Sequence, residues 1–108
     1  MTDSYRYRLT FTSGDNFTLD VQWLNEADEP VDLTEMAEWL EWIIDTDDHF
    51  VAATIEDYLT VDISTGTIHL VLPAEVTAEF EPRSYGRHVL KVYGSFQETI
   101  VRGAAYVR

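Results

Sequence analysis

The 108-residue chain contains no cysteine. Disulfides, thiolate nucleophiles and cysteine-ligated zinc or iron–sulfur sites are therefore excluded. A small domain without disulfides must rest on the packing of its core, which fits assembly in the cytosol. The chain also lacks any apolar run near the roughly 20 residues needed to span a bilayer. The first six residues lack the hydrophobic core of a signal peptide. We therefore expect synthesis in the cytoplasm without a signal peptide, and no membrane insertion.

Positive charge is missing from most of the sequence. No Lys or Arg occurs between residues 9 and 82, a stretch that holds 18 of the 20 Asp and Glu residues, and the net charge is −13. Nucleic-acid binding needs a basic footprint, and this surface would repel phosphate, so we expect no nucleic-acid partner. The acidity indicates a soluble surface in the first place. The alternative interpretation is a dipolar subunit whose basic edge meets an acidic partner.

Signatures of catalysis and of metal binding are also missing. The sequence has no Gly-x-Ser-x-Gly elbow, phosphate loop or dinucleotide fingerprint. His49, His69 and His88 do not form a chelating pair on one expected element. The acidic clusters at 26–29 and 45–48 lack the ligand spacing and central glycine of a calcium loop. We therefore predict no enzymatic activity, no catalytic residue, no metal site and no cofactor.

What the sequence does contain is a repeated alternation of apolar and polar residues. Phe17, Leu19, Val21 and Trp23 alternate with polar residues, which predicts a strand with those four side chains in the core. The runs 59–63 and 67–72 flank a short turn with Gly66 and predict a hairpin. Other alternating or strand-like runs cover residues 5–12, 50–55, 88–93 and 98–107. In the last of these, Gly103 is a candidate bulge.

The segment 35–45 allows two interpretations. Its apolar residues Met36, Trp39, Leu40, Ile43 and Ile44 follow a helical spacing. From Leu40 onward, apolar and polar residues also alternate in part, and Trp and Ile favour strands. The β-rich surroundings favour a strand over about 39–45, with the helix as the alternative. Residues 73–80 read as one short helical turn that begins with a proline.

Together these elements predict a single all-β domain over residues 1–108. Seven or eight short strands, with turn signals roughly every ten residues, are typical of an antiparallel sandwich of two sheets.

Several segments resemble one family when taken in order. They are residues 14–19, 30–34, the hairpin 59–72, residues 72–78 and the strand that follows Ser84-Tyr85-Gly86. The pattern resembles small immunoglobulin-like β-sandwich modules of tailed bacteriophages and prophages, and is similar to the amino-terminal domain of siphophage upper baseplate proteins. The resemblance implies an immunoglobulin-like sandwich in a non-enzymatic structural protein of the virion. Such a protein acts as an adaptor that binds other virion proteins in the tail, baseplate, neck or fibre attachment, in many symmetric copies.

Two departures from the family pattern keep alternatives open. Glu35-Met36 stands where relatives usually carry a glycine-containing turn, which maintains the helical alternative for 35–45. The sequence ends at Arg108 where relatives tend to continue into a fibre or stalk. That difference favours a second interpretation, a capsid decoration or capsid-associated protein.

Four residues are candidates for a partner interface. Arg6, Arg8 and Arg102 lie on the terminal strands, which would form one basic edge if those strands pair. Trp39 is the tryptophan that best fits an exposed position, and exposed aromatic anchors are enriched at interfaces. An exposed Trp39 also supports a further alternative, a module that binds a host glycan or receptor.

Overall fold

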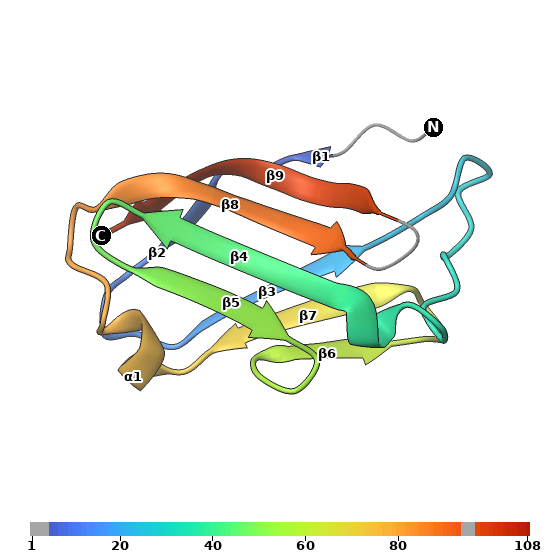
Figure 1. Ribbon diagram of the computed structural model, residues 1–108, viewed down its shortest axis with the longest axis horizontal. Helices are drawn as coiled ribbons and strands as arrows, with labels where there is room; N and C mark the ends of the chain where they lie inside the picture. Colours follow the sequence, from blue (N-terminus) through green and yellow to red (C-terminus); the bar gives the residue numbers. More distant parts are fainter. Residues whose placement is uncertain (1–4, 94–96) are drawn as a thin grey trace.

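The computed structural model describes residues 5–93 and 97–108, which form two β-sheets packed face to face (Figure 1). In chain order the elements are β1 (Tyr5–Arg6), β2 (Leu9–Phe11), β3 (Phe17–Gln22), the 3₁₀ turn η1 (Ala37–Trp39), β4 (Leu40–Thr46), β5 (Phe50–Thr54), β6 (Leu59–Asp62), β7 (Thr67–Leu72), α1 (Ala74–Thr77), β8 (Tyr85–Val92) and β9 (Glu98–Val107). No helical segment in this part of the chain has the length and hydropathy of a bilayer span.

The larger sheet has the order β1–β9–β8–β4–β5, with β2 also paired to β9. Both β1 and β2 run parallel to β9, so they are two parts of one N-terminal strand interrupted at Tyr7 and Arg8. Counted in this way, the described residues form eight strands, as predicted. The smaller sheet has the order β3–β7–β6, and all its pairings are antiparallel.

The strand order identifies the fold. In an immunoglobulin sandwich, strands G, F, C and C′ form one sheet, and strands B, E and D lie in the other. The orders β9–β8–β4–β5 and β3–β7–β6 reproduce this arrangement in the same chain sequence. Trp42 lies fully buried on β4, where such domains carry a buried tryptophan. The fold is immunoglobulin-like, as predicted.

The β3 strand confirms the alternation on which the fold prediction depended. Phe17, Leu19 and Val21 are half-buried and pack against the core, whereas the residues between them are exposed. Trp23, just beyond the strand, is 5% exposed. Fully burying a large apolar side chain contributes about 2 kcal/mol. Trp23 therefore contributes most of the four to anchoring the smaller sheet, and the three half-buried side chains contribute less.

The segment 35–45 is a strand preceded by one 3₁₀ turn, so the strand interpretation is confirmed. Leu40, Trp42 and Ile44 are buried in alternation along β4, which pairs with both β5 and β8. The 3₁₀ turn ends at Trp39. Ladder pairing on both sides of β4 satisfies its backbone groups, and this outweighs the helical spacing of its apolar residues.

The strand predicted at 98–107 is present as β9, but the bulge predicted within it lies at another residue. The bulge predicted at Gly103 lies instead at Ile100, because the register shifts between Leu90–Val101 and Lys91–Thr99. Gly103 pairs regularly with His88. A Cβ atom on Gly103 would collide with the backbone carbonyl of Tyr7, so this glycine serves a close approach between strands.

Short connections complete the framework. The hairpin around Gly66 is confirmed, with Gly66 in the left-handed region at φ +66°. The helical turn predicted at 73–80 is α1, in which Val76 is buried, and Phe80 is buried just after it. The Thr77 hydroxyl donates to the carbonyl of Asp15 (2.7 Å), which ties α1 to the turn before β3.

Candidate functional site

The N-terminal strand forms one edge of the larger sheet, next to β9. The sequence suggested a basic edge if the terminal strands pair, and they do pair, in parallel. Arg6 lies directly beside Arg102 in the register of β1 and β9. The predicted candidates Arg6 and Arg102 therefore meet although they are nearly the whole chain apart in sequence.

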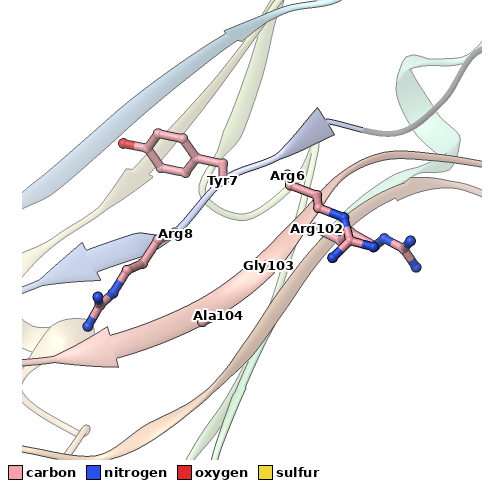
Figure 2. A pocket seen from close by; sticks show the side chains of 6 residues that line it. All are labelled: Arg6, Tyr7, Arg8, Arg102, Gly103 and Ala104. Atoms are coloured by element: carbon pink, nitrogen blue, oxygen red, sulfur yellow. The ribbon is translucent and has the colours of Figure 1, made fainter.

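The two side chains extend side by side from their strands (Figure 2). They line an open hollow of about 490 Å³ together with Tyr7, Arg8, Gly103 and Ala104. The structure shows no hydrogen bond or ion pair from either guanidinium to a described residue. Like charges directly opposite each other on neighbouring strands are destabilising. We call Arg6 and Arg102 the arginine pair.

The next strand of the same sheet shows a different arrangement of charge. On β8, Arg87 lies opposite Asp45 and Lys91 lies opposite Glu41 of β4. Arg102, by contrast, has Val89 on one side and Arg6 on the other. The strand register therefore places carboxylates beside Arg87 and Lys91 of β8, whereas neither strand neighbour of Arg102 is a carboxylate.

Arg8 is exposed but does not join the arginine pair. Its side chain points the other way along the edge (Figure 2). The guanidinium carbon lies 5.9 Å from the centroid of the Tyr106 ring, a cation–π geometry. Of the three arginines predicted from the sequence, two form one cluster and the third packs on an aromatic neighbour.

A buried chain of hydrogen bonds, here called the relay, connects Trp42 and His88 to the backbone of the N-terminal strand. The Trp42 indole N–H donates to Nδ1 of His88 (3.0 Å). The other ring nitrogen of His88, Nε2, then carries the proton and donates to the carbonyl of Tyr7 (2.6 Å). His88 is fully buried. Burial lowers the pKa of His88, and its hydrogen bond to Tyr7 partly opposes that shift.

The relay explains why the N-terminal strand is interrupted. The Tyr7 carbonyl points to His88 and passes close to the Cα of Gly103, which has no side chain in the way. The pairing with β9 is regular before this point, in β1, and after it, in β2. His88 faces inward, and both of its ring nitrogens are engaged in hydrogen bonds. Its role is to fix the strand that carries Arg6 and Arg8.

Trp39 lies apart from the arginine pair, since β8 and β9 separate β4 from β1. Its side chain is 49% exposed, which confirms the predicted exposure. It lines an open hollow of about 320 Å³ with Glu38, Leu40, Glu41, Thr54 and Tyr93. Burial raises the pKa of Tyr93, and the charge and hydrogen bond of Glu41 raise it further. This second site combines aromatic rings with carboxylates.

The remaining titratable clusters are small. His69 Nδ1 lies 2.7 Å from an oxygen of Asp20, and His49 Nε2 lies 3.0 Å from an oxygen of Glu79. Among the described residues, no three His, Cys, Asp or Glu side chains gather closely enough to hold a metal ion. The Asp48 carboxylate accepts the Glu81 backbone N–H, which lowers the pKa of Asp48.

Three participants in these sites were not predicted from the sequence. Tyr7, 48% exposed, lines both the arginine hollow and a second groove that faces β3. Gly103 permits the close approach of the N-terminal strand, and Tyr93 completes the Trp39 site. The positions of Tyr7 and Gly103 become clear only from the parallel pairing of the N-terminal strand with β9. Such long-range pairing leaves no local sequence signal.

No protein-family model and no curated protein matches the chain. Similar solved structures include a titin M10–obscurin-like 1 Ig complex, with 19% identity over 97% of this chain and 89% of that one, at a TM-score of 0.46. Another is the N-terminal four Ig domains of Dscam1 isoform 7.44, with 16% identity over 98% of this chain and 23% of that one, at a TM-score of 0.43. The strand order described above identifies the fold independently of these neighbours.

Proposed function

We propose that this domain is a non-enzymatic docking subunit of a tailed-phage particle, which binds other virion proteins through its N-terminal sheet edge. The observation that supports docking is the arginine pair, two exposed guanidiniums side by side that form no hydrogen bond or ion pair with a described residue. Their mutual repulsion is relieved when a partner supplies carboxylates, with which arginine forms bidentate hydrogen bonds. The resemblance of the sequence to phage sandwich modules supports a place in the virion.

The affinity of one such contact is modest, because exposed charge pairs are screened by salt and contribute little individually. Many copies arranged with the symmetry of a particle multiply the contact and raise the overall affinity without any new interaction. The net charge of −13 keeps the free subunits apart before they meet their partner.

The experiment is complementation of a phage that lacks this gene with the double variant Arg6→Glu/Arg102→Glu. We expect a folded protein that is lost from purified particles. The matched control is Arg83→Glu/Arg108→Glu, which changes the net charge equally at two exposed arginines elsewhere. Normal incorporation of the first variant would refute docking through the arginine pair.

The location within the particle is a separate question with its own measurement. Mass spectrometry of separated heads and tails should detect the protein in the tail fraction, as expected for a baseplate, neck or fibre adaptor. Recovery with heads alone would favour the decoration or capsid-associated alternative instead.

The Trp39 site supports a second candidate function, recognition of a host glycan. An exposed indole offers an apolar face to a sugar ring, and Glu38 and Glu41 supply hydrogen-bond acceptors in the same hollow. On a glycan array, this function predicts binding that Trp39→Ala abolishes and that Tyr85→Ala, at an exposed aromatic elsewhere, preserves. An array without reproducible binding would reject it.

A further inference from the structure

The outer edge of β3 has no neighbouring strand in the part of the chain that the structure describes. Within the described residues β3 pairs with β7 alone, whereas the corresponding immunoglobulin sheet has a fourth strand, A, beside B. The Trp23 N–H donates to the Gly66 carbonyl on the β7 side (2.8 Å). Because backbone groups alternate in direction along an antiparallel strand, Thr18, Asp20 and Gln22 direct their N–H and C=O groups to the open edge.

An apolar groove runs beside this edge. It has a volume of about 290 Å³ and lies where the N-terminal strand of one sheet faces β3 of the other. Its lining residues are Arg6, Tyr7, Leu19, Asp20, Val21, Gln22 and Val101. Leu19 and Val21 are half-buried, so part of their apolar surface still faces solvent. The groove and the open edge together form one continuous surface.

The unpaired backbone groups and the apolar groove of this surface fit an extended polypeptide. Three residues with outward backbone donors and acceptors at alternate positions match the repeat of a β-strand, which presents its own groups with the same period. The strand's side chains alternate, so every second one would face the groove and should be apolar. Arg6 also lines the groove and has no ion-pair partner among the described residues, whereas the carboxylate of the groove, Asp20, is bonded to His69. An acidic side chain therefore fits beside Arg6.

A second copy of this chain fits the surface less well. Pairing two β3 edges brings together two subunits with a net charge of −13 each, and their repulsion opposes association. The other edge of the same sheet, β6, has four residues, and none of them lines this groove.

We propose that the open edge of β3 accepts an extended segment of a partner protein, which adds as a fourth strand to the β3–β7–β6 sheet. The segment places alternate apolar side chains over Leu19 and Val21, and an acidic side chain beside Arg6. This inference deepens the proposed docking function, on which it rests, by naming the form of the partner.

The absence of cysteine makes a direct test possible, since one introduced thiol is unique in the chain. The variant Gln22→Cys is joined by a disulfide to the synthetic peptide Cys-Val-Thr-Val-Thr-Asp, or to its reverse, to cover both strand directions. Because Gln22 lies on the exposed face of β3, the peptide Cys shares that face and its Val and Asp side chains point to the groove. Tethering raises the effective concentration of the peptide to about millimolar, so weak strand addition becomes visible. The readout is amide hydrogen exchange of Thr18 and Asp20 by NMR, which we expect to slow at least tenfold in one of the two directions.

The matched control carries the same peptide on Thr60→Cys, an exposed position on β6, and should leave the exchange of Thr18 and Asp20 unchanged. Replacing each Val of the peptide by Asn should remove the protection. Replacing its Asp by Asn should weaken protection severalfold in the native background and have no effect beside Arg6→Gln.

Two results would overturn strand addition at β3. One is unchanged exchange of Thr18 and Asp20 with the peptide tethered in both directions, and the other is equal protection from the Thr60 tether. If either result occurs while Arg6→Glu/Arg102→Glu still loses incorporation, the docking function stands and the strand-addition inference is wrong. If protection is observed and incorporation is normal, the docking function of the arginine pair fails on its own.

Discussion

The two sides of the N-terminal strand differ in whether their polar groups have hydrogen-bond partners. On the inner side, Trp42, His88 and the Tyr7 carbonyl form a relay in which each donor meets an acceptor. On the outer side, Arg6 and Arg102 stand together without a described partner. Buried polar groups must be paired, because leaving one unpaired costs about 1–3 kcal/mol. Surface charges have no such requirement. The buried chain of hydrogen bonds is therefore required for stability, whereas the arginine pair can stay without a partner at the surface and is free to accept one.

The largest loss of stability should follow from removing a member of the buried relay. His88→Ala leaves the Trp42 N–H and the Tyr7 carbonyl without partners and opens a cavity, so we expect a loss of about 3 kcal/mol in the free energy of unfolding. Urea denaturation measures it. His69→Ala provides the control, because that ring bonds only to Asp20 at the surface and should cost under about 0.5 kcal/mol. Similar losses in the free energy of unfolding for both variants would show that the relay stabilises the domain no more than a surface hydrogen bond does.

A smaller loss is expected where the N-terminal strand crosses Gly103. Gly103→Ala places a methyl group against the Tyr7 carbonyl, and relief of this collision should cost about 2 kcal/mol. Hydrogen exchange should accelerate first in residues 5–11. The neighbouring substitution Ala104→Ser, on a half-buried position, should leave that exchange unchanged. Unaltered stability of Gly103→Ala would mean that the strand can shift without cost.

A graded effect should appear with pH. Because burial lowers the pKa of His88 in the folded protein, the unfolded chain binds the proton more readily. The free energy of unfolding should therefore fall as pH drops below about 6.5, the ordinary histidine pKa, and continue to fall until the pKa of folded His88 is reached. His88→Gln keeps a donor and an acceptor but does not titrate, so it should flatten the profile between pH 7 and 5. An equally steep profile in that variant would assign the effect to other groups.

The smallest effect should come from the outer side, and with the opposite sign. Arg102→Glu converts a like-charge neighbour of Arg6 into an opposite-charge neighbour, which should stabilise the domain by about 0.5 kcal/mol at low salt. Added salt should reduce the gain. Arg102→Gln, which removes repulsion without adding attraction, should gain less. A domain destabilised by Arg102→Glu would contradict the view that the arginine pair is retained at a cost to stability.

The sequence predicted the parts of the fold that have a local pattern. The alternation of Phe17, Leu19, Val21 and Trp23 fixes which face of β3 is buried, and the turn at Gly66 fixes the hairpin. The segment 35–45 needed its neighbours, because its spacing fits both a helix and a strand until β8 pairs with β4.

The candidate site was predictable only in part. The segregation of positive charge to the termini pointed to Arg6, Arg8 and Arg102, but their grouping depends on the register of β1 against β9. The same register decides that Gly103 lies under Tyr7, where the sequence suggested a bulge. Contacts between residues so distant in the chain are set by the assembled sheets, so no local rule could assign them.

The parallel pairing of the N-terminal strand with β9 also constrains how the chain is made. Leu9 lies beside Ala105 in that ladder, so the N-terminal strand leaves the ribosome before β9 and has to wait for β9 before the two can pair. Closing so long a loop is slow because its entropy must be lost before the contacts form. During that interval Arg6 has no neighbour at position 102. The arginine pair therefore forms only after β9 has been synthesised.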